Sequence, residues 1–148
     1  MGSKIDLEKL IEAAGDAIIA ADAEGQIILW NAAAERIFGF KASDALGRTL
    51  DLIIPERYRD RHWSGFQRVM ASGQTRYGSE LLRVPALHQN GAPLSIAFTV
   101  ALVKSQDGRV EAIAAIVRDE TARWSEERDL RRRIKQLEEQ TKKSDNAT

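Results

Sequence analysis

A single histidine stands in the middle of an apolar stripe on the best-defined helix of the sequence. Pro55 is a residue type that favours the first position of a helix, and Gly73 is a type that ends one. An imidazole between them can ligate a metal or transfer a proton. The alternative is a core histidine that is hydrogen-bonded to a carbonyl or a water. The residues at helical spacing on this face are Tyr58, His62, Phe66, Val69 and Met70.

The composition excludes several classes of partner. With 148 residues, we expect the chain to form one domain, or one domain with appendages. Lys plus Arg and Asp plus Glu are equal at 22 each, so no net charge attracts nucleic acid or an anionic membrane. No apolar run approaches the ~20 residues of a membrane span. The absence of cysteine fits a reducing compartment, and we expect a cytoplasmic protein.

The same inventory restricts the chemistry that a histidine could perform. A zinc site takes three or four protein ligands, whereas this chain has two histidines and no cysteine. The second histidine, His88, lies beside the Asn90-Gly91 turn, where we expect it to be exposed. The sequence shows no Ser/His/Asp order, phosphate-binding loop or carboxylate pair, so we do not expect an enzyme.

The other elements follow from turn residues and from periodicity. Two β-rich runs around a glycine turn predict a hairpin, and Asn31 is a natural N-cap for the helix that follows it. Asn90-Gly91 and Asp107-Gly108 are hairpin turns between extended segments. The predicted helices are 5–14 and 32–38, a further turn covers 43–47, and the predicted strands are 17–22, 27–30, 76–85, 93–104 and 109–119.

These elements predict an α+β fold. The strands form a five-stranded antiparallel sheet, with short helices and one long helix on one face and amphipathic helices at both termini. Segment 93–104 alternates apolar with small or polar residues, so one of its faces is buried. Segment 112–117 is apolar nearly throughout, which favours a central position. A ligand pocket can open between the helix of His62 and the concave face of the sheet.

A charged helix is predicted from residue 120 onward. Its apolar residues repeat at 4-3-4 spacing, which is typical of a coiled-coil seam and favours a homodimer through the terminal helices. The alternative is an amphipathic helix that packs on its own domain. We expect the tail, 142–148, to be frayed. The seam residues are Leu130, Ile134, Leu137 and Thr141.

The order of elements, with four of its motifs, resembles the PAS domain. The motifs are DAEGQIILWN at 22–31, AERIFGF at 34–40, Asn90-Gly91 and RDET at 118–121. The resemblance implies a PAS fold over 5–121, preceded by residues 1–4 left from cloning and followed by a signalling or coiled-coil helix over 122–148. PAS domains are sensory modules that pass a signal to an effector such as a histidine kinase of a two-component system.

Residues 54–73, IPERYRDRHWSGFQRVMASG, resemble the corresponding helix of FixL-type oxygen sensors. In that family the histidine of this segment ligates heme iron, so the resemblance implies heme b with His62 as the iron ligand. It also implies propionate contacts by Arg68 and Arg76. Tyr58, Phe66 and Met70 would line the side of the histidine, and Ile96, Phe98 and Val100 would face the other axial position of the iron.

The chemistry of heme fits a chain with so few ligands, because the porphyrin supplies four nitrogens and one neutral imidazole completes the site. One position departs from the family. FixL-type sensors place an arginine that stabilises bound dioxygen where this chain has Leu82. Arg83 follows it, but adjacent strand residues point to opposite faces. An apolar site suits carbon monoxide, nitric oxide or a redox-linked ligand change better than stable dioxygen binding.

We therefore expect a heme-binding PAS domain that detects a diatomic gas (O2, CO or NO) or redox state and passes the signal through its C-terminal helix. The alternative is a heme-free PAS module for dimerisation or small-molecule binding. Cysteine-dependent light sensing requires a thiol that this chain lacks, although a non-covalent flavin remains compatible with the sequence.

Overall fold

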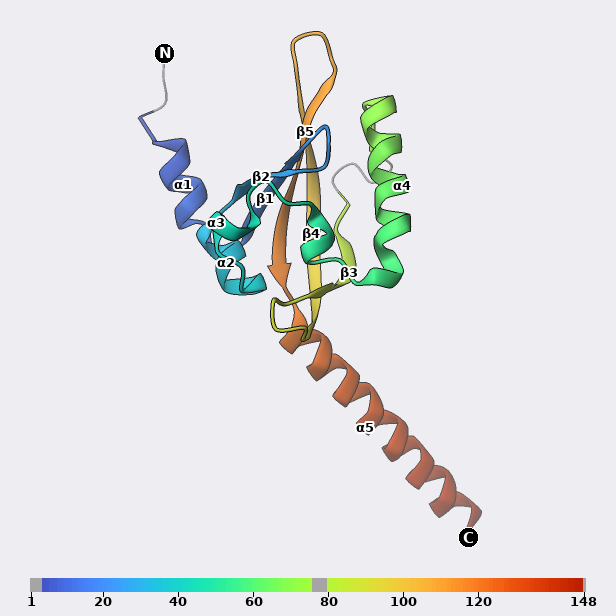
Figure 1. Cartoon of the computed structure of the whole chain (residues 1–148). Coiled ribbons are helices and arrows are strands. Elements are labelled where there is room, and N and C mark those ends of the chain that lie inside the picture. Colours follow the sequence, from blue (N-terminus) through green and yellow to red (C-terminus); the bar gives the residue numbers. More distant parts are fainter. Residues whose placement is uncertain (1–3, 76–79, 148) are drawn as a thin grey trace.

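A five-stranded antiparallel sheet is the centre of the fold, as the sequence predicts (Figure 1). The computed structural model describes residues 4–75 and 80–147. The strand order is β2-β1-β5-β4-β3, and β5 is central, as its apolar sequence indicates. The strands are β1 Ala17–Asp22, β2 Ile27–Trp30, β3 Leu82–Leu87, β4 Pro93–Lys104 and β5 Val110–Asp119.

The helices differ in how closely they pack on this sheet. Apolar side chains of α2, α3 and the segment around η1 share one core with the strands. The long helix α4 stands beside β3 and β4 (Figure 1). The helical elements are α1 Leu7–Ala13, α2 Ala32–Phe38, α3 Ala42–Ala45, η1 Leu50–Leu52, α4 Glu56–Ser72 and α5 Thr121–Asn146.

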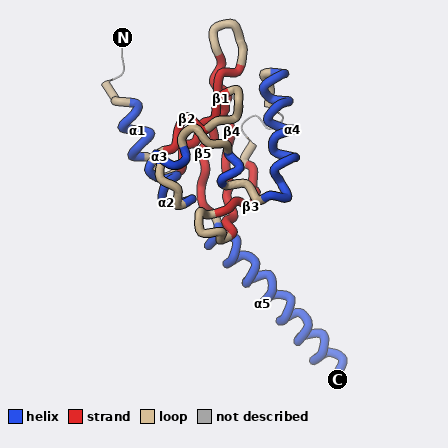
Figure 2. Tube along the Cα trace, viewed as in Figure 1, coloured by secondary structure: helices blue, strands red, loops and turns tan. Residues whose placement is uncertain are grey.

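The C-terminal helix α5 extends away from the domain (Figure 2). None of its residues is buried, so it does not pack along its own domain, which was one of the two arrangements that its sequence allowed. Its seam residues Leu130, Ile134 and Leu137 are 61%, 55% and 53% exposed. Among the described residues, no helix combines the length and the apolar character that a bilayer crossing requires.

Strand register assigns each side chain to one of two faces. Leu82 of β3 lies opposite Phe98 of β4, which lies opposite Val117 of β5. Val117 is 3% exposed and belongs to the core, so this row of side chains lies on the inner face. Arg83 lies opposite Ala97 and therefore lies on the outer face.

Asn31 joins three segments of the N-terminal half. Its side chain is fully buried, and its Oδ1 accepts hydrogen bonds from the backbone N–H of Ile18 at 2.9 Å and of Ala34 at 3.0 Å. The bond from Ala34 confirms the predicted N-cap of α2. Its Nδ2 donates to the carbonyls of Ile11 at 2.8 Å and Asp16 at 3.1 Å. One carboxamide thus links α1, β1 and α2.

The boundaries of the first strand of the meander differ from the prediction of 76–85. Strand β3 begins at Leu82 and continues past Pro85 to Leu87. Proline is tolerated there because β3 is, among the described residues, an edge strand with a neighbour, β4, on one side only. On its other side no described strand needs a hydrogen bond from the missing N–H. Part of the predicted strand, 76–79, lies outside the described residues.

Replacing Asn31 by alanine should destabilise the whole domain. The substitution removes four hydrogen bonds from backbone groups that are buried or partly buried, and a buried group left without a partner costs about 1–3 kcal/mol. We expect the free energy of unfolding, measured by urea denaturation, to fall by about 3 kcal/mol or more. Asn90→Ala is the control, because exposed Asn90 accepts one turn hydrogen bond from Ala92. Equal losses in the two variants would contradict the linking role of Asn31.

Candidate ligand site on helix α4

Helix α4 carries the predicted site on a half-buried stripe. The helix ends as predicted at Gly73, which has a φ of 69° and donates its N–H to the carbonyl of Val69 at 2.8 Å. No residue of α4 is fully buried, although its stripe is shielded relative to the charged face. The half-buried stripe consists of Tyr58, His62, Phe66, Val69 and Met70.

His62 is a polar group that its surroundings leave unsatisfied. Its Nδ1 atom is buried, and among the described residues it has no hydrogen-bond partner. The imidazole lies edge-on to Trp63, with ring centroids 4.7 Å apart, and 6.3 Å from the ring of Phe66. A buried nitrogen without a protein partner on an apolar stripe fits a group that ligates a metal-centred cofactor.

The protonation state of His62 also suits a ligand. Burial lowers the pKa of His62 from its ordinary value of 6.5, and the negative charge of Asp51 opposes this shift without reversing it. A lowered pKa keeps the imidazole neutral at pH 7, and the neutral form is the one that ligates metals.

Of the two arginines predicted to contact the propionates, the structure describes one. Arg68 lies on α4 with its side chain exposed, which leaves its guanidinium free to approach an anionic group. Arg76 lies outside the described residues. The propionate contacts of Arg68 and Arg76 remain predictions.

Tyr58, on the same helix, is half-buried, and its ring lies 4.8 Å from the guanidinium of Arg57.

The predicted opposite side of the pocket is an apolar patch on the sheet, which we call the sheet wall. Ile96 is 6% exposed, and the other members are half-buried. The register places all of them on the inner face, so the predicted alternation is in register. The sheet wall consists of Leu82, Ile96, Phe98 and Val100.

Arg83 cannot substitute for the arginine that FixL-type sensors carry at the position of Leu82. The register between β3 and β4 is unshifted at this point, and Arg83 therefore lies on the outer face. Its Nε atom lies 3.9 Å from a carboxylate oxygen of Glu120, at the start of α5. The expectation that these adjacent residues point to opposite faces is confirmed.

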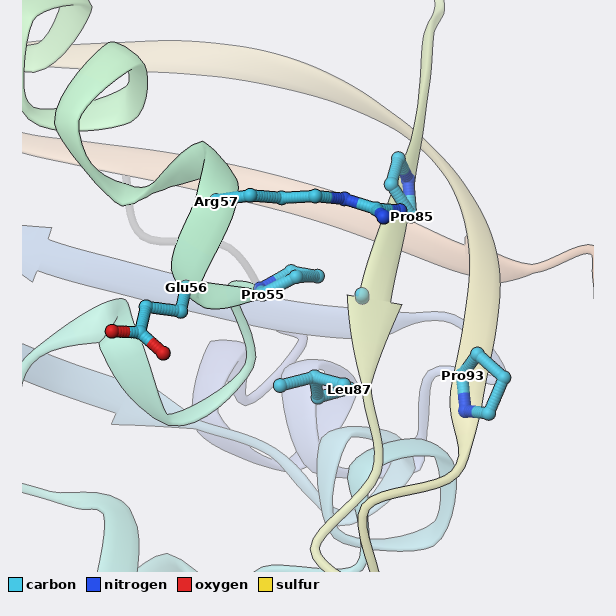
Figure 3. A pocket seen from close by; sticks show the side chains of 7 residues that line it. Pro55, Glu56, Arg57, Pro85, Leu87 and Pro93 are labelled. Carbon is cyan, nitrogen blue, oxygen red and sulfur yellow. The ribbon is translucent and has the colours of Figure 1, made fainter.

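Two grooves of the described residues lie away from His62. The larger, of about 550 Å³, separates the first turn of α4 from β3, and Arg57 extends across it toward Pro85 (Figure 3). A second, of about 360 Å³, lies on the charged surface of α5. Neither includes His62 or the sheet wall. The larger groove is lined by Pro55, Glu56, Arg57, Pro85, Ala86, Leu87 and Pro93.

The second histidine forms part of a turn. His88 is half-buried, not exposed as expected, because Gly39 has no Cβ and leaves room for the imidazole against its backbone. Its Nδ1 accepts a hydrogen bond from the N–H of Asn90 at 3.1 Å. Within residues 4–75 and 80–147, no three His, Cys, Asp or Glu side chains are grouped to hold a metal ion.

Three residues near His62 were not predicted from the sequence. The indole Nε1 of Trp63 donates to Oδ1 of Asp51 at 2.8 Å. Arg59 donates to the backbone carbonyls of Asp51 at 3.2 Å and of Ile54 at 3.0 Å. The sequence could have pointed to Trp63 only through its position next to His62. The hydrogen-bond partners of Trp63 and Arg59 could not be predicted, because they depend on how α4 packs on η1.

Known proteins share this architecture. A profile described as the PAS fold matches residues 5–119. The crystal structure of a PAS domain from Colwellia psychrerythraea superposes with a TM-score of 0.68, at 21% identity, over 78% of this chain and 95% of that domain. At that identity the superposition supports the fold.

Three relatives match parts of the sequence. An uncharacterized protein of Azorhizobium caulinodans is 36% identical over 83% of this chain. The sensor protein FixL of Bradyrhizobium diazoefficiens is 37% identical over 42% of it. The oxygen sensor protein DosP of Escherichia coli is 24% identical over 74%. The chain spans 17%, 12% and 13% of the lengths of these relatives, so it corresponds to a small part of each.

The titration of His62 in the heme-free protein tests the environment described above. We expect NMR to give a pKa below 6.5, and Asp51→Asn to lower it further by removing the charge that favours the protonated ring. Between the lowered pKa and 6.5 the unfolded chain binds more protons, so stability should increase with pH across that interval. His62→Phe should abolish this dependence. A pKa at or above 6.5 would contradict the burial of the ring.

Proposed function

The chain belongs to the PAS family of sensory domains, and we propose that it binds heme b through His62 and detects a diatomic gas or redox state. The observation that carries the proposal is the neutral imidazole of His62, whose buried Nδ1 has no partner among the described residues. The resemblance of 54–73 to the ligand helix of FixL-type sensors, together with the FixL and DosP relatives, supports the same function.

Heme, when bound, supplies an iron centre that takes a gas ligand or changes its oxidation state. The residues of this chain hold and shield it. With heme bound, His62 would ligate the iron, Phe66 and Met70 would line the side of the imidazole, and the sheet wall would limit the access of water. Arg68 and Arg76 would neutralise the propionates.

The sheet wall bears on which signal is detected. Leu82 offers no hydrogen-bond donor, and the guanidinium of Arg83 is held on the outer face near Glu120. Stable binding of dioxygen is favoured by a donor that interacts with its partial negative charge. Carbon monoxide, nitric oxide or a change of oxidation state therefore suits this wall better than dioxygen.

The output passes through α5. This helix begins two residues after β5 ends, and its apolar seam is exposed in the single chain. A second copy of the helix would cover Leu130, Ile134 and Leu137, so we infer a homodimer through the terminal helices. A dimeric helix at this position can connect to an effector such as a histidine kinase, since the chain corresponds to a small part of its relatives.

A heme-free dimerisation or small-molecule module is the second candidate function. It is favoured by the location of the two grooves, because neither is lined by His62 or by the sheet wall. This function predicts that the protein takes up no hemin and that His62→Ala leaves the dimer intact.

The heme proposal is tested by titrating the purified protein with hemin and recording the Soret band. We expect one hemin per chain for the wild type. His62→Ala should weaken binding at least about 100-fold, because loss of a residue that only supports a metal ligand already costs about 10–100-fold. His88→Ala is the matched control and should bind like the wild type. A wild type without hemin uptake, or an unchanged spectrum in His62→Ala, would refute the proposal.

The dimer is tested by placing a charge in the α5 seam. Ile134→Asp buries a carboxylate in the proposed interface, so we expect sedimentation to show a shift from dimer to monomer. Gln136→Asp makes the same change in charge on another face of the helix and should leave the dimer intact. A chain that ends after Thr121 should be monomeric. Equal behaviour of the two Asp variants would argue against this seam.

A further inference from the structure

Trp63 connects α4 to two segments that precede it in the chain. Its indole N–H donates to the carboxylate of Asp51 in η1, at 2.8 Å. Its ring also lies over Gly25, in the turn between β1 and β2: a Cβ added at Gly25 would lie 2.6 and 2.8 Å from two ring carbons. Real Cβ atoms do not approach carbon atoms so closely, so the ring occupies the space that a side chain would take.

The turn that supports the ring is itself fixed. Gly25 has a φ of 83°, which glycine adopts without strain. The side chain of Asp22 accepts hydrogen bonds from the backbone N–H groups of Glu24 at 3.0 Å and Gln26 at 2.9 Å. The indole therefore rests on a backbone whose shape is set by its own hydrogen bonds.

Arg59 strengthens the connection between α4 and η1. It lies one helical turn before Trp63, so both side chains leave the same side of the helix. Its guanidinium donates to the carbonyls of Asp51 and Ile54. The carboxylate and the carbonyl of Asp51 thus both receive hydrogen bonds from α4.

These contacts bear directly on His62. Trp63 is adjacent to His62 in sequence, its ring lies edge-on to the imidazole at 4.7 Å, and it lies 5.2 Å from Phe66. No residue of α4 is fully buried, and none belongs to the hydrophobic core cluster of the described residues. Its position and rotation depend correspondingly more on its hydrogen bonds and on the Gly25 contact.

We propose that Trp63, through its hydrogen bond to Asp51 and its contact with Gly25, is the positioning residue that fixes α4 and so orients the imidazole of His62. The role of Trp63 in orienting a heme ligand rests on the proposed function. Its role in orienting the His62 ring applies to the heme-free protein as well. Trp63 does not touch the cofactor in this role; it acts through the helix.

The first experiment compares two glycine substitutions in the heme-free protein. Gly25→Ala and Gly91→Ala impose the same left-handed strain, since the φ angles are 83° and 84°, but a Cβ at Gly91 meets nothing within 4 Å. Only Gly25→Ala displaces the indole. We expect faster amide exchange along α4 and shifted NMR signals of the His62 ring in Gly25→Ala, and neither change in Gly91→Ala. Equal effects in both variants would overturn the proposal.

The second experiment separates the hydrogen bond from the packing. Trp63→Phe keeps an aromatic ring and loses the N–H, and Asp51→Ala loses the acceptor. Both should accelerate exchange along α4, whereas Asp51→Asn retains an acceptor oxygen and should restore slow exchange. In the hemin-loaded protein, Trp63→Phe should shift the Soret band and weaken binding about 10–100-fold. Unchanged exchange and affinity in Trp63→Phe would refute the positioning role.

The two proposals fail in different ways. A wild type that takes up no hemin refutes heme binding, but amide exchange and the His62 signals still decide whether Trp63 positions the helix. A wild type that binds hemin, with Trp63→Phe and Gly25→Ala indistinguishable from it, refutes the positioning role and leaves heme binding intact.

Discussion

The buried carboxamide of Asn31 is the interaction on which the arrangement of this domain depends. An amide in the core must satisfy its donors and acceptors, and this one does so only when the end of α1, the start of β1 and the first turn of α2 meet around it. That requirement fixes where the β1–β2 hairpin stands relative to the helices. The turn at Gly25 belongs to this hairpin and contacts Trp63, so the position of α4 follows indirectly from Asn31.

The two helices flanking the core are held in different ways. Helix α2 buries Ala33, Ala34 and Phe38, whereas α4 buries no residue completely and relies on Trp63 and Arg59. Apolar burial is the dominant stabilising term in a fold, so α4 can shift at less cost than α2. A helix with this weak attachment is suited to respond to a ligand, and it is the helix that carries His62.

Local patterns were sufficient to predict most of the fold. Hairpin turns, the N-cap at Asn31 and the opposite faces of Leu82 and Arg83 follow from residue type and from the two-residue period of a strand. The extent of β3 differs from the predicted 76–85, because the strand continues past Pro85, which an edge strand tolerates. The contacts of Trp63 with Asp51 and Gly25 could not be predicted, since they join residues 12 and 38 positions apart through an arrangement that no local pattern encodes.

The junction with α5 links the C-terminal helix to the strands that carry the sheet wall. The exposed guanidinium of Arg83 and the carboxylate of Glu120 are 3.9 Å apart, and such pairs contribute about 0–1 kcal/mol. The firmer connection is to β4: Glu120 donates its N–H to the carbonyl of Ser95 at 2.8 Å, and the N–H of Ser95 donates to the hydroxyl of Thr121 at 3.0 Å. Ser95 is followed directly by Ile96, a member of the sheet wall. A displacement of the wall would therefore reach the first turn of α5 through backbone hydrogen bonds of β4, and the ion pair on β3 would add little to it.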